Sequence, residues 1–530
     1  MAEEVLDLKR FLSSVKLGDP AAELTPMVSD QLQKVTEDVG DEDRFLSALA
    51  ALIYNVEPTK GKLEKSQIAD AVDKIDDLIN QQLNDIIHDP NFQKMESQWT
   101  ALNDVIQHTN FRANVVIDFL DAGKDELAED FEDNSVDITG GALFKKTYIS
   151  EYDQYGGKPY GALIGFYEFE HTPKELFWLR QMGKIAAVSH APFLGSLSPK
   201  FFGCDTIEEL AGLKDVTALL SQPKYGAWQT LRDTPEAAYL GLTLPRYVLR
   251  LPWHPETNPC GGDLPFVEQT NGNDDSKFLW GPATALLARN MIKSFEGSGW
   301  CQYLRGPKGG GLVTGLPAHT MTLGGESVVK APVEMQIPDF RELEFANAGL
   351  IPLIYRKGTA DCCFFSVQAV KAPKKFKDPK DSENAQLVCN LSYTFSVTRV
   401  AHYLKCMMRD NIGSSADGDY VKLQIENWIG QYITTVTNPD NLTLRYFPFK
   451  AATVDVQKQE GLVGMYSCQV AILPHVQFEG MDCELRLESR LGQRRWQPFV
   501  SYTSVAGVES ALAPSQSTLD TQPTFNSQRA

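Results

Sequence analysis

The spacing of apolar residues predicts two consecutive helices near the start of the chain. Between residues 67 and 87 apolar side chains recur every three or four positions, which puts them on one face of an α-helix, at Ile68, Val72, Ile75, Ile79, Leu83 and Ile86. Pro90 ends this helix because proline has no backbone N–H to donate. A second series at helical spacing follows at Phe92, Met95, Trp99, Leu102 and Ile106.

Two segments of different character follow these helices. Residues 114–120 (NVVIDFL) form a short, mainly apolar run that predicts a buried strand. Residues 125–133 (DELAEDFED) are strongly acidic, and a run of like charges is typical of a solvated face. From about residue 140 to 360, strand-like runs such as GALIGFYEF and LPRYVLRLP alternate with glycine and proline breaks. This alternation predicts a mixed α/β region.

The C-terminal third predicts a helix pair followed by strands. A basic stretch, residues 371–380 (KAPKKFKDPK), precedes it as a linker or an exposed loop. Residues 398–432 contain helical spacing on both sides of Gly413, the expected C-cap, and the second helix, residues 420–436, carries Trp428 and Tyr432. Alternation with a period of two predicts half-buried strands at residues 452–457, 465–473 and 483–488. The first 60 residues are expected to form an arm, and the last 30 or so, rich in Ser, Thr, Gln and Pro, a disordered tail.

Charge and composition narrow the function classes. The chain has 530 residues, enough for two to four domains, and a net charge of -19, which argues against nucleic-acid binding because that needs a basic face. No run approaches the roughly 18 apolar residues of a membrane span, so no membrane insertion is expected. The N-terminus is acidic where a secretory signal is basic, which predicts a location in the cytoplasm. The nine cysteines contain no C-x-x-C and are interpreted as buried thiols.

Candidate chemistry is sparse. The glycine clusters at residues 156–157 and 309–311 lack the form of a phosphate-binding loop and are predicted to be tight turns. His190 has no metal ligand at suitable spacing. His402, Arg409 and Asp410 suggest a general base, but His402 and Arg409 are seven positions apart, about 10 Å along a helix, so structural ion pairing is favoured. We therefore expect no catalysis, cofactor or metal, and the alternative is an enzyme that uses His190 or His402 as a base.

Several motifs resemble one family, the large subunit of the type VI secretion contractile sheath, known as TssC, VipB or IglB. Its glycine signature matches this chain at Gly156, Gly157, Pro159, Tyr160, Gly161, Leu163, Ile164 and Gly165. Phe166 departs from the aspartate that is common in the family. Further matching segments are IIHDPNFQKMESQWTAL, LPRYVLRLP, the GGG-x-V-x-GLP loop, RVAHYLKCMMRDNIGS, ENWIGQY and ILPHVQFEG. The resemblance covers about residues 65–492.

The resemblance implies a multidomain α/β (mixed α+β) contractile-sheath fold, similar to phage tail sheath proteins. It implies an N-terminal arm (residues 1–65), a helical region that packs with the small sheath subunit (66–140), a central outer α/β domain (141–370), a C-terminal inner domain of sheet and helices (371–492) and a flexible tail (493–530). Such proteins co-assemble with the small subunit TssB (VipA or IglA) in hexameric rings around an Hcp inner tube. Contraction then propels the tube, its spike and effectors into target cells.

The family further implies baseplate contacts and a ClpV-type recycling ATPase that acts through the small subunit. We expect assembly contacts at His402, Lys405, Arg409, Asp410, Trp428, Tyr432, Val454, Val456, Leu485 and Leu487. The last four lie on predicted strands, and such strands suit a sheet that is shared between subunits. The alternative is a sheath protein of a contractile phage tail or a related injection particle, which usually assembles from one sheath chain.

Overall fold

The computed structural model describes residues 65–475, apart from 262–263, 271–276, 324–325, 375, 437–438 and 460–464. The chain divides into two compact units, and each is described by itself. Unit 1 extends to Ser97 and includes Arg250–Leu279, and unit 2 comprises Gln98–Leu249 and the residues from Trp280 onward.

Unit 1 contains the two helices that the apolar spacing predicts. Helix α4 (Lys65–Ile87) and helix α5 (Pro90–Gln107), which continues into unit 2, confirm both predictions. Pro90 is the first residue of α5, a position where its missing N–H has no cost and its fixed φ suits the helix. Asp89 precedes it, and its Oδ1 accepts hydrogen bonds from the backbone N–H groups of Asn91 and Phe92.

Unit 2 is built on a six-stranded mixed sheet. The strand order is β1 (Leu163–Phe169), β2 (Phe193–Leu197), β3 (Leu240–Leu244), β9 (Ile351–Tyr355), β10 (Cys362–Phe364) and β6 (Leu312–Val313). The first four strands are parallel, and the last two pairings are antiparallel. Every residue of β2 and β3 is buried, which explains their continuous apolar sequences.

Helices α8 (Pro173–Ser189) and α12 (Thr284–Ser298) cover opposite faces of this sheet. Leu242 of β3 belongs to the apolar core that α8 completes, whereas Thr243, the next residue, meets Thr284 of α12. Neighbouring strand residues point to opposite faces, so the two helices lie on different sides. Where α12 meets β2 and β3, the hydroxyls of Ser196, Thr243 and Thr284 lie 2.8 to 2.9 Å from one another and form a three-membered ring of oxygen atoms.

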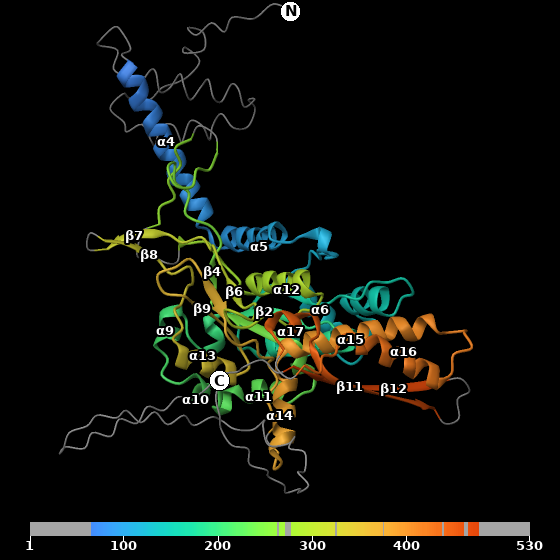
Figure 1. The fold of residues 1–530 in the computed structure, drawn as a ribbon. Coiled ribbons are helices and arrows are strands. Elements are labelled where there is room, and N and C mark those ends of the chain that lie inside the picture. Colours follow the sequence, from blue (N-terminus) through green and yellow to red (C-terminus); the bar gives the residue numbers. More distant parts are fainter. Residues whose placement is uncertain are drawn as a thin grey trace, which may run out of the picture. The chain divides into compact units, whose positions relative to one another are not determined.

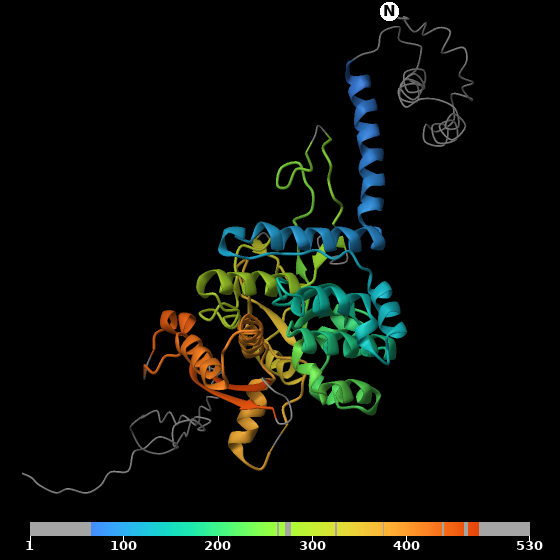
Figure 2. The same cartoon turned by 90° about the vertical axis from the view of Figure 1, so that its right-hand side faces the viewer.

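The other elements of unit 2 surround this core (Figures 1 and 2). They are the helices η2 (Phe111–Ala113), α6 (Lys124–Asp133), η3 (Ile138–Gly140), α7 (Ala142–Phe144), η4 (Lys145–Tyr152), η5 (Pro199–Phe202), α9 (Ile207–Gly212), α10 (Val216–Leu220), η6 (Pro223–Tyr225), α11 (Gly226–Arg232), η7 (Glu236–Tyr239), α13 (Asp339–Asn347) and α14 (Pro379–Val388) and the strands β4 (Tyr247–Val248), β5 (Trp280–Gly281), β7 (Thr320–Leu323) and β8 (Glu326–Val329). The predicted acidic face is the exposed side of α6.

The prediction of a buried strand at residues 114–120 was wrong. This segment belongs to no strand, and Val116 and Phe119 are 69% and 59% exposed. The sequence has the β-branched and aromatic composition of a strand, but no neighbouring strand pairs with it among the described residues. The composition of a segment favours an extended backbone, but the segment becomes a buried strand only where another strand pairs with it.

The C-terminal part of unit 2 contains the predicted helix pair and two of the predicted strands. Helix α15 (Leu391–Asp410) begins earlier than expected, and helix α16 (Gly418–Gly430) ends earlier. Helix α17 (Asn441–Tyr446) precedes β11 (Phe449–Lys458) and β12 (Tyr466–Pro474), which form a separate antiparallel pair. The prediction that Gly413 is the C-cap of the first helix was wrong, because Asn411 is the C-cap of α15 and Gly413, with φ +82°, lies in the turn that follows. The predicted strand at 483–488 lies outside the described residues.

The glycine cluster at residues 309–311 makes a tight turn. A Cβ atom at Gly311 would lie 2.3 Å from the carbonyl oxygen of Phe364 and 2.6 Å from the backbone nitrogen of Gly306. Backbone atoms cannot yield as a flexible side chain can, so the close approach requires glycine.

Gly311→Ala is expected to lower the melting temperature by several degrees, because its Cβ atom would force the backbone apart at a cost of about 2 kcal/mol or more. Gly297→Ala is the matched control, since Gly297 lies in α12 with no atom within 4 Å of the added Cβ, and it should stabilise the chain by up to about 1 kcal/mol. Thermal unfolding of both variants measures the difference. Equal melting temperatures for the two would contradict the close backbone contact.

Candidate functional site

Helix α15 directs three of its predicted polar residues toward Ser189 and residues 152–154 of the same chain. His402, Lys405 and Arg409 are three and four residues apart and therefore share one face of the helix. His402 Nε2 lies 3.1 Å from the carbonyl oxygen of Ser189, at the end of α8. Lys405 Nζ donates a hydrogen bond of 2.7 Å to Oδ1 of Asp153, which follows η4.

Arg409 caps the C-terminal end of η4. Its guanidinium donates hydrogen bonds to the carbonyl oxygens of Gln154 (2.8 Å), Tyr152 (3.2 Å) and Asp153 (3.2 Å). A helix end has carbonyl groups without intrahelical partners and a partial negative charge, so a cation stabilises it. Asp410 is exposed, and no hydrogen bond or ion pair of its side chain is found within the described part of the chain. The structure thus gives three of the four predicted residues intramolecular partners.

An aromatic cluster surrounds His402. The ring centroid of Tyr152 lies 5.5 Å from that of His402, and the ring of His190 lies 6.3 Å away. Lys405 Nζ lies 3.8 Å from the centroid of the Tyr152 ring, a cation–π geometry. His190 caps α8 in the left-handed conformation, with φ +51°. Tyr239 of η7 closes the cluster from the other side of His190.

The protonation of this cluster follows from its burial. Burial lowers the pKa of His402 to about 4, with smaller lowering effects from His190, Arg399 and Lys405. Burial and the charge of Lys405 also lower the pKa of His190. The hydrogen bond from Lys405 and its charge lower the pKa of Asp153. At neutral pH this cluster therefore contains two uncharged imidazoles, those of His402 and His190. It also contains one ion pair, between Lys405 and Asp153.

Trp428 and Tyr432 lie in the packing between the helix pair and the first strand of the C-terminal sheet. The rings of Tyr432 and Trp428 are 5.4 Å apart, and Tyr432 also meets Trp300 at 5.1 Å. Trp300 in turn contacts Phe449, the first residue of β11. These aromatic contacts fix α16 against α15 and β11 by burying apolar area.

Val454 and Val456 lie on β11 and pack toward α16. Val454 is buried in a cluster with Val421 and Ile425, and the partly buried Val456 packs against this cluster. In the antiparallel register Val454 faces Val470 and Val456 faces Cys468. Leu485 and Leu487 lie outside the described residues.

An apolar groove separates α15 from β12. It has a volume of about 310 Å³ and is lined by Val397, Val400, Ala401, Leu404, Lys405, Met408, Cys468, Val470 and Ile472. Strand β12 pairs with β11 along one edge, and in the described part of the chain no strand pairs with its other edge. Among the described residues, the outer edge of β12 is therefore unpaired and lies beside the apolar groove.

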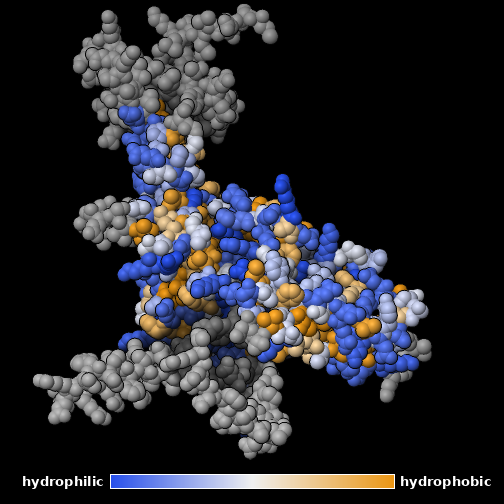
Figure 3. All heavy atoms as spheres, in the orientation of Figure 1, coloured by the Kyte–Doolittle hydropathy of each residue, from blue (hydrophilic) through white to orange (hydrophobic). Residues whose placement is uncertain are grey.

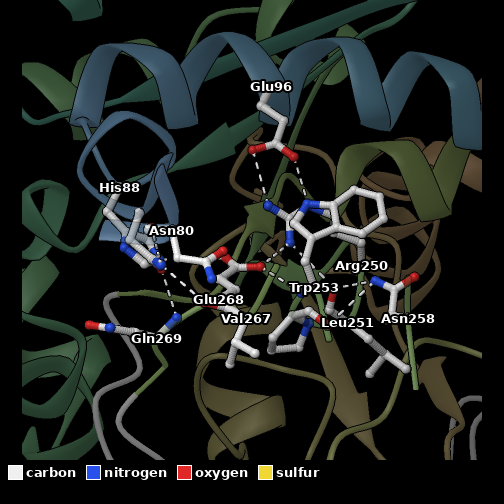
Figure 4. A network of polar contacts seen from close by, with 12 residues as sticks. Asn80, His88, Glu96, Arg250, Leu251, Trp253, Asn258, Val267, Glu268 and Gln269 are labelled. Carbon is white, nitrogen blue, oxygen red and sulfur yellow. Dashed lines mark hydrogen bonds and ion pairs between the residues drawn. The ribbon is translucent and has the colours of Figure 1, made fainter. Parts of the chain in front are cut away.

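A network of ion pairs in unit 1 was not expected from the sequence (Figure 4). Arg250 donates to Glu96 of α5 at 2.7 Å and to Glu268 at 2.6 Å, and its guanidinium lies 5.1 Å from the ring centroid of Trp253. The side chain of Glu268 is 2% exposed, and that of Arg250 is 13% exposed. His88 Nε2 lies 3.5 Å from the other oxygen of Glu268. Two of the matching motifs contain members of this network, IIHDPNFQKMESQWTAL with His88 and Glu96 and LPRYVLRLP with Arg250, but neither indicates that these side chains meet.

Comparisons with known proteins agree with this architecture. A family model described as the EvpB/VC_A0108 tail sheath N-terminal domain matches residues 69–371, and the tail sheath gpW/gp25-like domain matches residues 380–491. The type VI secretion system sheath protein TssC1 of Pseudomonas aeruginosa PAO1 is 37% identical over 422 residues, which cover 79% of this chain and 84% of that protein. In the part that the structure describes, no helix is long and apolar enough to cross a membrane.

Two solved structures of the anti-feeding prophage are also similar in part. Its baseplate matches with 11% identity and a TM-score of 0.32, over 59% of this chain and 66% of the matched chain. Its helical sheath in the contracted state matches with 13% identity and a TM-score of 0.29, over 60% of this chain and 68% of the matched chain.

The two domain matches define a tail sheath protein of mixed helices and sheets, which confirms the predicted fold class. The chain belongs to the TssC family of type VI secretion sheath proteins. Its established role is therefore structural, as the large subunit of a contractile sheath.

The stability of the chain is expected to decrease as the pH falls from about 6.5 toward 4. The unfolded chain binds a proton on His402 at its ordinary pKa of about 6.5, whereas the folded chain does so only near 4, so acid favours the unfolded state. His402 alone contributes a loss of up to about 1.4 kcal/mol per pH unit in this window. Thermal unfolding between pH 4 and 8 should show a flatter profile for His402→Gln. Parallel profiles would contradict the assigned burial.

Arg409→Glu is expected to destabilise the chain by about 2 kcal/mol or more, because it removes three hydrogen bonds and puts a carboxylate against a helix C-terminus. Asp410→Arg is the matched control at the exposed neighbour and should change stability by less than about 0.5 kcal/mol. Denaturant unfolding of both variants measures the two effects. If Arg409→Glu unfolds like the unaltered chain, the capping role is wrong.

Proposed function

We propose that this chain assembles with a smaller sheath subunit, TssB, into hexameric rings that stack as a helical tube around an inner tube of Hcp. The observation that carries this proposal is the unpaired edge of β12 beside the apolar groove. Baseplate components and a ClpV-type ATPase, which acts through the small subunit, are the further partners that we propose. The proposed location is the bacterial cytoplasm, and the proposed role involves no catalysis.

The β11–β12 pair is incomplete as a sheet. A two-stranded antiparallel pair is only marginally stable by itself, and monomeric proteins usually protect exposed strand edges. Here β12 presents one edge to the outside while its apolar side chains, including Val470 and Ile472, face the groove. A strand from a neighbouring subunit would pair with the backbone of β12 and fill the groove with its apolar side chains.

This form of attachment suits a sheath that contracts. Main-chain hydrogen bonds hold an added strand irrespective of most of its side chains, so subunits remain joined while they move as rigid bodies. We propose that the strand predicted at residues 483–488, with Leu485 and Leu487 on one face, supplies such a strand to a neighbour. Helix α4, whose Leu78, Ile79 and Ile86 are exposed, is the proposed contact with the small subunit.

Val397→Lys is expected to prevent tube formation, because it puts an ammonium group into the groove. Val397 is 45% exposed in the chain alone, so its replacement should leave the fold intact. Electron microscopy of the chain co-expressed with the small subunit is the measurement. Ile412→Lys, at an 80% exposed position outside the groove, is the control and should still give tubes.

Compact particles from the unaltered, co-expressed chain would overturn the proposed assembly. Tubes from this chain expressed alone would instead indicate a sheath built from one chain, as in contractile phage tails. Normal tubes from Val397→Lys would show that the groove stays empty in the assembly.

A further inference from the structure

Helix α15 has two sides with different partners, and Lys405 belongs to both. On one side, His402 and Arg409 contact backbone carbonyl groups at the ends of α8 and η4. On the other side, the helix lines the apolar groove with Val397, Val400, Ala401, Leu404 and Met408. Single exposed apolar side chains are common on this chain (Figure 3), so the groove alone does not distinguish α15. Lys405 does, because it bonds to Asp153 at 2.7 Å while its side chain also lines the groove.

Positive and neutral groups surround the imidazoles of His402 and His190, and negative groups are scarce. The titratable and charged side chains that lie around them are Tyr148 and Tyr152 of η4, Asp153 after it, Tyr239 of η7, and Arg399, Lys405, Cys406 and Arg409 of α15. In the described part of the chain, the only ion pair among these groups joins Lys405 to Asp153. A proton on either imidazole therefore adds a positive charge beside cations that share a single carboxylate.

The hydrogen bond of His402 leaves no partner for a second proton. The carbonyl oxygen of Ser189 can only accept, so Nε2, 3.1 Å away, carries the hydrogen and Nδ1 carries the lone pair. An added proton goes to Nδ1, and among the described residues no hydrogen bond of Nδ1 is found. A buried N–H group without an acceptor is costly, and a charged one more so. In agreement with this geometry, burial lowers the pKa of His402 to about 4, with smaller effects from His190 and the neighbouring cations.

We propose that His402 and His190 form an acid-sensitive latch, which holds α15 on α8 and η4 at neutral pH. Protonation of the imidazoles releases the helix locally while the central sheet stays folded. Release separates Lys405 from Asp153 and so disturbs the wall of the groove. The latch itself does not depend on what fills the groove. Only its effect on assembly rests on the proposed function, in which the groove receives a strand.

The pH at which the latch opens follows from the two environments of His402. The released side chain binds its proton near the ordinary pKa of 6.5, whereas the latched one does so near 4. The latch is therefore intact above about pH 6.5 and weakens as the pH falls toward 4. His402 alone raises the fraction of released helix by roughly tenfold on going from about pH 7.5 to about pH 5.5. His190 acts in the same direction, because burial and the charge of Lys405 lower its pKa.

Hydrogen exchange of the full chain at about pH 7.5 and about pH 5.5 tests the latch. After correction for the pH dependence of intrinsic exchange, residues 148–154 and 399–410 should lose protection by roughly tenfold or more at the lower pH, while β2 and β3 stay protected. His402→Gln keeps a neutral donor for Ser189 and should reduce this loss to about threefold or less. His108→Gln is the matched control at a side chain that is 48% exposed, and it should lose protection like the unaltered chain.

His190→Asn gives a second variant, because asparagine suits the left-handed conformation of this residue. Combined with His402→Gln, it should remove the difference between the two pH values. Circular dichroism and thermal unfolding at neutral pH verify that all variants fold. A tenfold difference that persists in the double variant would overturn the latch, and so would equal protection of the unaltered chain at both pH values. Loss of protection in β2 and β3 together with α15 would indicate global unfolding and reject a local release.

Tubes of the chain co-expressed with the small subunit separate the latch from the proposed function. A strand in the groove holds α15 from its other side, so the loss of protection at the lower pH should be smaller in tubes than in the free chain by about threefold or more. An equal loss in both would overturn the link between the latch and the groove. If the latch opens in the free chain and no tubes form, the latch stands and the proposed assembly is wrong.

Discussion

Backbone hydrogen-bonding groups that local structure leaves unpaired are the constraint on which the arrangement of this chain depends. Inside unit 2, arginine side chains satisfy them. Arg409 donates to three carbonyl oxygens after η4, and Arg341, only 8% exposed, donates to those of Leu210, Ala211 and Leu213 at the end of α9. A guanidinium suits this role because it offers five donors in one plane and carries the charge that a helix C-terminus favours. At the outer edge of β12 no such side chain is found among the described residues, and this is the edge at which we propose that a strand from another subunit completes the pairing.

The sequence predicted those elements whose stability depends on local pattern. Helices α4 and α5 follow from the three-and-four spacing of apolar residues, and strands β11 and β12 follow from alternation with a period of two. The segment at residues 114–120 shows where this reasoning fails. Its residues have strand composition and strand-like alternation of burial, but a strand exists only with a neighbour to pair with, and pairing depends on the whole fold or on another chain.

The same limit applies to the site residues. The sequence placed His402, Lys405 and Arg409 in the first helix of the predicted pair, and in the structure all three lie on α15. Their partners are Ser189 and residues 152–154, which lie more than 200 positions earlier in the chain, and nothing local indicates them. The network around Arg250 is a stronger case, since Glu96 is 154 residues away. Two carboxylates around one guanidinium offset the cost of removing these charges from water, and that balance becomes visible only in three dimensions.

The buried hydroxyl ring of Ser196, Thr243 and Thr284 has a consequence for how this sequence can diverge. Each hydroxyl has one proton to donate, and that of Thr243 can go either to a neighbouring hydroxyl or to the carbonyl oxygen of Gly195, which lies 3.2 Å away, so the three side chains and this carbonyl form one buried network. Replacing one of them with an apolar residue of similar shape leaves its neighbours with unfilled roles at a site that is at most 2% exposed, whereas replacing all three removes the need for a partner. Substitutions at these positions on β2, β3 and α12 are therefore expected to be energetically coupled, so that the cost of changing two of them differs from the sum of the two single costs.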